Sequence, residues 1–334
     1  MKAAIVGCGL VGRRRARVAA THPSTSVALV VDAHDGAARD LAAAIGCAWS
    51  VDWRESLAAD IDVVVVSTPT GLLAEIGVAA LGAHKHVLIE KPMGRNIDEA
   101  ATLAQAAAAA RRRLKVGFNH RYHPALALAH ERFLSGEFGQ LINARARYGH
   151  GGRPGYENEW RGDPESAGGG ELTDQGVHVL DLLRWFAGDP SAVYCERQTA
   201  VWPIAPLEDN AFALLRYPSG AVASVHTSWT QWKNLFSFEI FAAEGALAVE
   251  GLGSSYGVER LIETRRNPAG GPPQTSEFVF EGPDESWRLE WAQFVEAIER
   301  GSAYHGDPPS GLAVMRVLDA LYRSSLAGLP VTLD

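Results

Sequence analysis

The chain has 334 residues, which at about 150 residues per domain predicts roughly two domains with a substantial buried core. Hydrophobic residues make up 47% and charged residues 21%, a composition that excludes the disordered and fibrous classes. Asp and Glu (39) outnumber Lys and Arg (31), giving a net charge of -8. An acidic protein repels phosphate backbones, so we expect a small-molecule partner and no nucleic acid.

Two further features bear on the compartment. The three cysteines, Cys8, Cys47 and Cys195, are odd in number and far apart, which is typical of a reducing environment. The N-terminal apolar run meets glycines at once, and the run at 62–67 is far shorter than the about 20 residues of a membrane span. We therefore expect a cytoplasmic protein with no membrane partner.

Up to residue 120, short β-branched runs alternate with Ala-rich stretches of helical character. The runs are continuously apolar, as strands covered on both faces are, and lie at 3–6, 27–31, 63–66, 87–89 and 114–118. Crossover helices are expected between them, at 11–20, 37–44, 72–81 and 97–113. This βαβ repetition predicts a doubly wound α/β domain over residues 1–120.

The pattern changes over residues 121–334. A helix is expected at 125–134 and a loop rich in Gly, Pro and Trp at 148–170. Strand-like runs follow at 194–201, 211–217, 221–229 and 236–241, with Pro218-Ser219-Gly220 as the clearest hairpin turn. These runs predict an α+β domain with a mostly antiparallel sheet. Two amphipathic stretches, 289–300 and 312–326, are expected either to close this domain or to pack back on the first.

A glycine-rich loop follows the first predicted strand. Gly7, Gly9 and Gly12 form G-x-G-x-x-G, in which the first glycine permits a tight turn, the second admits a pyrophosphate and the third lets helix and strand pack closely. Asp32 ends the second strand, where its carboxylate can accept hydrogen bonds from ribose hydroxyls. Asp32 also repels a 2′-phosphate, so NAD is favoured over NADP, with nearby Arg39 as the counter-indication.

Four arginines occupy the first turns of the helix after this loop: Arg13, Arg14, Arg15 and Arg17. Successive helix residues point in different directions, so we interpret them as a solvated positive face. Contact of one of them with the pyrophosphate is the alternative.

Glu90-Lys91-Pro92 directly follows the strand at 87–89. Ligands of open α/β sheets bind beyond the carboxyl ends of the strands, which is where Lys91 is expected. Pro92 disfavours helical geometry at Lys91, so the ammonium is a candidate electrophile. A surface salt bridge is the alternative.

A triple glycine, 168–170, introduces a segment that contains Asp174 and His178. In a helix these two residues share one face, at positions i and i+4. A carboxylate beside a histidine fixes its tautomer and raises its basicity, which suits proton transfer from a hydroxyl. A structural hydrogen bond is the alternative. The pairs His84 with His86 and His120 with His123 lack a third ligand at metal spacing, so no metal is expected.

Together these four ordered motifs closely resemble the glucose-fructose oxidoreductase and inositol dehydrogenase family, called Gfo/Idh/MocA. The resemblance extends to residues 83–87 and 117–122. It implies an N-terminal Rossmann domain that binds NAD or NADP, and a C-terminal domain with an open sheet that forms the substrate cleft and the oligomer interface. It therefore implies a homodimer or homotetramer. The family's usual catalytic group matches Lys91, Asp174 and His178.

The resemblance also extends the expected site. The expected cofactor-binding residues are Gly7, Gly9, Leu10, Val11, Gly12, Asp32, Ser67, Thr68, Pro69, Glu90 and Lys91. The expected substrate-binding residues are Lys91, Asn119, Arg121, Tyr148, Tyr156, Trp160, Arg161, Asp174 and His178. For the residues between 148 and 161, loop packing is the alternative. Leu73 departs from the family, whose members often carry a histidine a few residues after the T-P-x turn.

These assignments predict reversible, NAD-dependent oxidation of a secondary hydroxyl on a sugar, sugar derivative or cyclitol. His178, oriented by Asp174, takes the hydroxyl proton, while Lys91 stabilises the oxygen as hydride leaves. Two alternatives stay open. One is a glycosidase or epimerase that uses transient oxidation, and the other is a sugar sensor that binds NAD without catalysis.

Overall fold

The computed structural model describes residues 1–333, which form two compact units. The first unit comprises Met1–Phe118, Glu165–Gly168 and Trp287–Met315. The second comprises Asn119–Pro164, Gly169–Ser286 and the chain from Arg316 onward. The break after Phe118 lies close to the division expected at residue 120. Residues 287–315 return to the first unit, which is one of the two outcomes expected for the amphipathic stretch at 289–300. The return of residues 165–168 has no signal in the sequence patterns.

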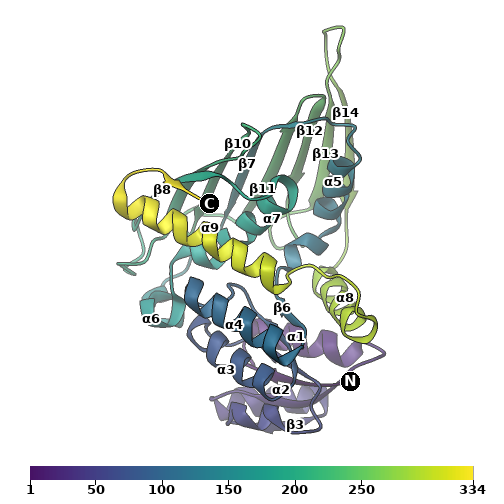
Figure 1. Cartoon of the computed structure of the whole chain (residues 1–334), viewed down its shortest axis with the longest axis vertical. Coiled ribbons are helices and arrows are strands. Elements are labelled where there is room, and N and C mark those ends of the chain that lie inside the picture. Colours follow the sequence, from purple (N-terminus) through teal and green to yellow (C-terminus); the bar gives the residue numbers. More distant parts are fainter. Residues whose placement is uncertain (334) are drawn as a thin grey trace. The chain divides into compact units, whose positions relative to one another are not determined.

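The first unit is built on sheet A, a six-stranded parallel sheet in the order β3-β2-β1-β4-β5-β6 (Figure 1). This strand order is that of the doubly wound Rossmann fold, so the predicted fold class is confirmed. The strands are β1 (Lys2–Val6), β2 (Ser26–Val31), β3 (Ala48–Ser50), β4 (Val63–Val66), β5 (His86–Ile89) and β6 (Leu114–Val116). Strand β3 was not predicted, because a three-residue edge strand with one buried residue has no recognisable period.

Helices cover both faces of sheet A. On one face, Ala16 of α1 and Leu41 of α2 share a core with Trp291 and Phe294 of α8, so the first late amphipathic stretch packs back on this unit. On the other face, Gly77 of α3 lies close to Leu103 of α4. The helices that lie wholly or mostly in this unit are α1 (Leu10–Thr21), α2 (Asp35–Ile45), η1 (Trp53–Leu57), α3 (Thr70–Gly82), α4 (Ile97–Ala110), α6 (Pro164–Ala167) and α8 (Ser286–Arg300).

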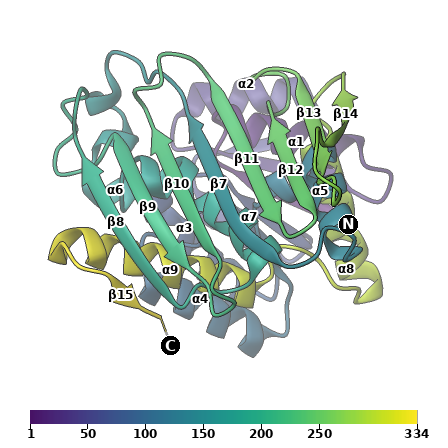
Figure 2. The same cartoon turned by 90° about the horizontal axis from the view of Figure 1, so that it is seen from above.

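The second unit is built on sheet B, whose nine strands lie side by side in the order β14-β13-β12-β11-β7-β10-β9-β8-β15 (Figure 2). Every neighbouring pair is antiparallel except β7 with β10, so the expected mostly antiparallel sheet is confirmed. The strands are β7 (Leu141–Gly149), β8 (Ala192–Gln198), β9 (Asn210–Arg216), β10 (Val222–Ser228), β11 (Leu235–Ala242), β12 (Gly245–Glu250), β13 (Glu259–Arg265), β14 (Gln274–Phe280) and β15 (Val331–Thr332).

One face of sheet B is covered by helices and the other is open. Helix α7 buries Val179 and Leu182, and its Phe186 ring lies 5.2 Å from Phe238 of β11. The opposite face, turned to the viewer in Figure 2, carries no helix within residues 1–333. The helices that belong wholly or partly to this unit are η2 (Asn119–Tyr122), α5 (Pro124–Leu134), η3 (Tyr156–Asn158), η4 (Trp160–Gly162), η5 (Leu172–Gly176), α7 (Val177–Ala187) and α9 (Pro308–Ala327).

Across residues 1–333, none of the helices combines the length and the apolarity that crossing a bilayer requires.

Candidate functional site

The glycine loop of the first unit has the geometry of a phosphate cradle. Gly7 has φ +95°, and a Cβ there would lie 2.5 Å from the Ser67 carbonyl oxygen. A Cβ on Gly12 would lie 1.8 Å from the Gly7 oxygen, so only glycine allows α1 to approach β1 this closely. A Cβ on Gly9 would have no atom within 4 Å, which leaves open space in front of α1. Each glycine therefore has the structural property expected of it.

The amide groups at the start of α1 follow Gly9 directly. Gly9 is the N-cap and makes no side-chain capping bond, and the first residue of the helix, Leu10, is 73% exposed. The first N–H groups of any helix lack partners within the helix, and they carry the positive end of the helix dipole. Leu10, Val11 and Gly12 thus present backbone donors suited to an anionic diphosphate.

The turn between β4 and α3 lies beside the glycine loop. Ser67 donates its backbone N–H to the Val6 carbonyl at 2.7 Å, and Pro69 is the N-cap of α3. The hydroxyl oxygens of Ser67 and Thr68 are buried and have no hydrogen-bond partner among residues 1–333. Buried hydroxyls normally have partners, so these two fit a ligand placed against the loop. Leu73, where the family often has histidine, is buried in α3.

Asp32 is fixed at the end of β2 by two backbone donors. Its Oδ2 accepts from the Cys8 N–H at 2.7 Å and its Oδ1 from the His34 N–H at 2.8 Å. Each carboxylate oxygen keeps a lone pair for a further donor, and one of its present donors, Cys8, belongs to the cradle itself. The orphaned hydroxyls, the open cradle and this acid together fit a dinucleotide.

Arg39, the nearby cation that could favour NADP, is engaged in other contacts. Its guanidinium pairs with Asp35 one turn earlier on α2, at 2.9 Å, and lies 4.7 Å from the centroid of the Trp49 ring.

Lys91 follows β5 at the carboxyl end of sheet A, as predicted. Its neighbour Glu90 donates its backbone N–H to the Val66 carbonyl at 2.9 Å and turns its carboxylate into the protein. Glu90 Oε1 there accepts from Arg15 Nε at 2.7 Å. Burial raises the pKa of the Glu90 carboxyl, while the charges of Arg15 and Lys91 oppose that rise.

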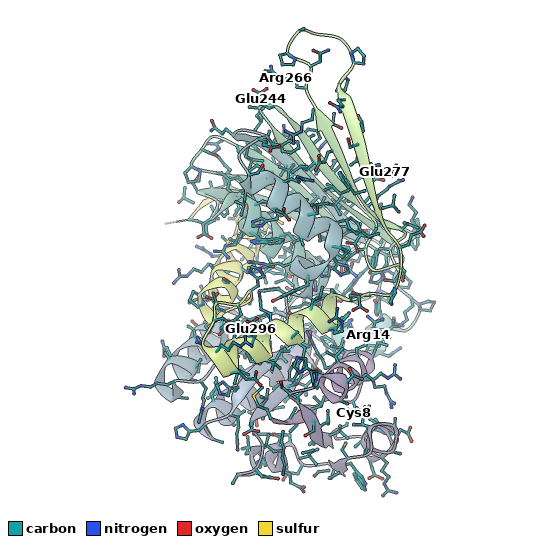
Figure 3. The ribbon with its side chains drawn as sticks, turned by 90° about the vertical axis from the view of Figure 1, so that its right-hand side faces the viewer. Cys8, Arg14, Glu244, Arg266, Glu277 and Glu296 are labelled. Carbon is teal, nitrogen blue, oxygen red and sulfur yellow. The ribbon has the colours of Figure 1, made fainter. Side chains whose placement is uncertain are left out.

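The interpretation of the four arginines as a solvated face is wrong for Arg15, which is 1% exposed. Its guanidinium bonds Glu90 and, at 2.5 Å, Glu290 of α8. Arg14 and Arg17 are exposed, as expected. Arg14, labelled in Figure 3, lies 5.6 Å from the centroid of the Trp287 ring at the start of α8.

In the second unit, Asp174 and His178 lie on a continuous helix, but its first part is a π-helical turn, η5, followed by α7. Four residues overshoot one turn of an α-helix, which holds 3.6 residues. A π turn holds more residues than an α turn, so it brings positions i and i+4 closer to alignment. Asp174 is half-buried, and its Oδ2 accepts from Arg161 Nε at 3.2 Å.

Gly170, the last of the three glycines before this helix, is required by a close approach to the loop before β9. A Cβ on Gly170 would lie 2.1 Å from the Glu208 carbonyl oxygen. The buried Glu208 carboxylate accepts from the N–H groups of Gly170 and Leu172, both at 3.1 Å. Tyr322 donates its hydroxyl to the same carboxylate at 2.8 Å. Glu208 thereby satisfies the start of the helix that carries Asp174 and His178.

His178 is stacked on a second histidine. The ring centroids of His178 and His120 lie 3.7 Å apart, with 16° between the ring planes. His120 Nδ1 lies 3.2 Å from Asn119 Oδ1, and its Nε2 lies 3.2 Å from the Tyr148 hydroxyl. Asn119 in turn donates to Ser286 Oγ at 2.9 Å. The second unit therefore brings His178, Asn119 and Tyr148 together through His120.

The structure also places four other predicted substrate residues. Arg121 makes a bidentate pair with Asp181 of α7, at 2.8 and 2.6 Å, which ties η2 to α7. The Arg161 guanidinium lies 4.4 Å from the centroid of the Trp160 ring, on the side of the loop that reaches Asp174. Tyr156 is buried, and burial raises the pKa of its hydroxyl above the usual value.

Several residues around this helix were not predicted. Gln175 donates its side-chain amide to the Tyr256 hydroxyl at 2.7 Å, and the Tyr256 and Tyr148 ring centroids lie 5.1 Å apart. His150 lies beside Tyr156, at 6.2 Å between centroids, and burial lowers the pKa of His150. Tyr256 and Glu208 come from loops without motifs, so only the position of Gln175, next to Asp174, was a usable signal.

Comparison with known proteins assigns both units. A model described as "Oxidoreductase family, NAD-binding Rossmann fold" matches residues 1–118, and one described as "GFO/IDH/MocA C-terminal domain" matches residues 126–248. The chain belongs to the Gfo/Idh/MocA family. Its first unit is thus an NAD-binding Rossmann domain, as the cradle geometry indicates.

Family members with known activities cover the chain to different extents. Levoglucosan dehydrogenase from Pseudarthrobacter phenanthrenivorans is 31% identical over 59% of this chain, and the match spans 57% of its own length. D-xylose 1-dehydrogenase (NADP(+)) 2 from Haloferax volcanii is 28% identical over 95% of this chain and 94% of its own. Inositol 2-dehydrogenase from Rhizobium meliloti is 25% identical over 96% and 95%.

A solved structure of levoglucosan dehydrogenase in complex with NADH and levoglucosan superimposes with a TM-score of 0.89. It is 25% identical to this chain and covers 99% of each.

Proposed function

We propose that this Gfo/Idh/MocA protein is an NAD-dependent dehydrogenase that oxidises a secondary hydroxyl of a sugar, sugar derivative or cyclitol. The observation that carries the proposal is that both units keep the family's reactive side chains. Lys91 follows a strand of the dinucleotide-binding sheet, and Asp174 and His178 lie on the η5–α7 helix.

Each of these side chains has a role that its chemistry supports. His178 takes the hydroxyl proton as general base, and Asp174, one turn earlier, orients its imidazole. Lys91 donates a hydrogen bond to the same oxygen and stabilises the negative charge that develops there. The bound nicotinamide supplies the hydride acceptor for the carbon. In the reverse direction, His178 returns the proton.

The cofactor preference rests on two residues. Asp32 offers carboxylate oxygens to the ribose hydroxyls and repels a 2′-phosphate. Arg39, the cation nearby in sequence that could neutralise such a phosphate, pairs with Asp35 and lies over Trp49. These contacts favour NAD over NADP.

The substrate class is supported by the relatives, which act on levoglucosan, D-xylose and inositol according to their names. In the second unit, Arg161 bonds Asp174 on the η5–α7 helix and stacks on Trp160. Asn119 and Tyr148 contact His120, whose ring stacks on His178 of the same helix. Rings and hydrogen-bonding groups of this kind suit a polyol that has apolar C–H faces and many hydroxyls.

The test is an NADH-fluorescence screen across inositols, anhydrosugars, aldoses, amino sugars and nucleotide sugars, each with NAD and with NADP. We expect reduced cofactor to form with at least one polyol and to form faster with NAD. Turnover without added NAD, by protein that carries bound cofactor, would instead indicate transient oxidation in a glycosidase or epimerase. Sugar binding without any NADH would indicate a sensor.

The open face of sheet B supports a second proposal, self-association as a homodimer or homotetramer. The strand register places Phe212 and Leu214 of β9, Val222 of β10 and Val279 of β14 on this face, and each is at least 41% exposed. Charged side chains such as Arg145 and Glu239 lie among them. Exposed apolar side chains rimmed by charges are typical of protein interfaces.

A further inference from the structure

Arg15 is the centre of a buried charge cluster within the Rossmann unit. Its Nε bonds Glu90 Oε1 at 2.7 Å and its Nη1 bonds Glu290 Oε2 at 2.5 Å. Lys115 Nζ lies 3.8 Å from the other Glu290 oxygen and also donates to the His305 carbonyl. The Trp287 ring covers the guanidinium at 4.5 Å. Two cations and two anions balance, so the cluster is neutral.

A buried network of this kind does not by itself stabilise a protein more than apolar residues would. A functional role for this charge cluster therefore depends on which parts of the protein it connects. Here it joins the helix that begins at the phosphate cradle to the residue that directly precedes Lys91.

Glu90 lies near two cations that compete for its carboxylate. Arg15 holds it at hydrogen-bond distance inside the protein, and the Lys91 charge also acts on it. The chain bends at Lys91, directly after Glu90, and the Arg15 ion pair holds the Glu90 carboxylate on the buried side. Without Arg15, the nearest cation left for Glu90 on its own peptide is Lys91, and the two groups would pair.

Gly117 leaves room for the ion pair between Arg15 and Glu90. A Cβ at position 117 would lie 2.7 Å from Arg15 Nη2 and 2.9 Å from Glu90 Oε2. Nη2 is buried and has no hydrogen-bond partner among residues 1–333. The glycine that precedes Phe118 is therefore explained by this ion pair and not by a turn.

We propose that Arg15 is a positioning residue for Lys91: it holds the Glu90 carboxylate inside the Rossmann unit, so that the Lys91 ammonium is directed to the substrate oxygen. The inference rests on the proposed dehydrogenase function, because it assigns Arg15 an effect on Lys91 chemistry.

The experiment is a double-mutant cycle in the whole protein with Arg15→Met, Lys91→Met and the double variant. NADH formation is first followed with levoglucosan, D-xylose and myo-inositol, and the substrate that the wild type oxidises fastest is used for the cycle. Slow variants are assayed overnight at high enzyme concentration. We expect Arg15→Met to lower kcat about 100-fold, the effect of displacing a catalytic group by about 1 Å. In the Lys91→Met background, the same change should lower kcat by no more than about twofold.

Two readouts separate positioning from a merely structural role. NADH affinity, measured by fluorescence, should change less than about threefold, because the cradle does not include Arg15. Glu90→Gln added to Arg15→Met should restore kcat at least about tenfold, because the uncompensated carboxylate is removed. Arg17→Met, on the exposed side of the same helix, is the matched control and should leave kcat unchanged. If Arg15→Met does not fold, Gly117→Ala, which crowds the same pair, takes its place in the cycle.

Equal losses of kcat with and without Lys91, or no rescue by Glu90→Gln, would overturn the inference. An inactive wild-type protein, or a fully active Lys91→Met variant, would instead overturn the proposed function.

Discussion

At the scale of single residues, Asp32 shows how a motif residue gains its orientation from the backbone. Both of its oxygens accept a backbone N–H, one from the glycine loop and one from the start of α2. The carboxylate is therefore placed before any cofactor binds, and the ribose meets a fixed acceptor.

Replacing Asp32 tests the cofactor preference. Hydrogen bonds to a charged group contribute about 1.5–3 kcal/mol, so Asp32→Ala should lower kcat/KM for NAD about 10- to 100-fold. The kcat/KM for NADP should fall less or even rise, because the repulsion between Asp32 and the 2′-phosphate is removed. Steady-state kinetics with both cofactors give the ratio, and Asp40→Ala, on the exposed side of α2, is the control. An unchanged NAD to NADP ratio would contradict the role of Asp32.

Arg15 shows why some residues could not be assigned from the sequence. Its neighbours Arg14 and Arg17 follow the solvated pattern, and nothing local distinguishes the three. The deciding partner, Glu290, lies 275 residues later in the chain. The glycines and Asp32, in contrast, could be assigned because their spacing alone determines their role.

At the scale of elements, the η5–α7 helix depends on a contact from outside its own sequence. The Glu208 carboxylate accepts from the N–H groups of Gly170 and Leu172, and its own charge complements the helix N-terminus. Burial raises the pKa of Glu208, while Tyr322 and Arg197 oppose that rise. The start of the helix that carries Asp174 and His178 is therefore held by a buried acid.

Removing this acid should weaken the whole second unit. Glu208→Gln leaves a buried amide where several donors need a carboxylate, so the free energy of unfolding should fall by about 1–3 kcal/mol. Urea unfolding followed by tryptophan fluorescence measures it. Glu196→Gln, on exposed positions of β8, is the control and should have little effect. A Glu208 variant as stable as the wild type would show that the helix start needs no anion.

The elements that could be predicted from the sequence are those whose burial is continuous or strongly periodic. The core strands of sheet A were predicted for this reason, and most predicted ends lie within a few residues of the observed ones. Strand β7 alternates small Ala residues with Arg, and β14 has no buried residue, so neither has a strong apolar period. The π turn could not be predicted, because it forms beside Glu208 from a distant loop.

At the scale of the whole molecule, two half-buried histidines set a pH dependence. Burial lowers the pKa of His130, stacked on Trp185 at 3.7 Å, from 6.5 to about 4. Burial, with the charges of Arg112 and Arg113, lowers the pKa of His86 to about 4 as well. Between pH 4 and 6.5 the unfolded chain binds more protons at these sites than the folded protein does.

It follows that these histidines reduce stability as the pH falls from 6.5 toward 4. The free energy of unfolding of His130→Phe should therefore fall less over this window than that of the wild type. Urea unfolding at half-unit pH steps gives the free energy of unfolding of both proteins. Their difference isolates His130, because the other titrating groups contribute equally to both. Parallel curves for the two proteins would contradict the lowered pKa of His130.

Self-association through sheet B also belongs to this scale. Adding Phe212→Glu and Leu214→Glu together should reduce the particle mass in light scattering to that of one chain, because charges would be buried without partners. Leu326→Glu changes a side chain that is 85% exposed outside the sheet and should leave the mass unchanged. A wild-type mass of one chain would contradict the proposed assembly.

The proposed action of Lys91 on the substrate oxygen during hydride transfer can be tested with a single variant, Lys91→Met. Lys91→Met keeps the length of the side chain and removes its donor. NADH affinity and kcat are measured on the same preparation, with the best polyol from the screen. We predict NADH affinity within about threefold of the wild type and a kcat lower by about 1,000-fold, as for the loss of a donor to a developing oxyanion. A Lys91→Met variant that turns over as fast as the wild type would contradict this role of Lys91.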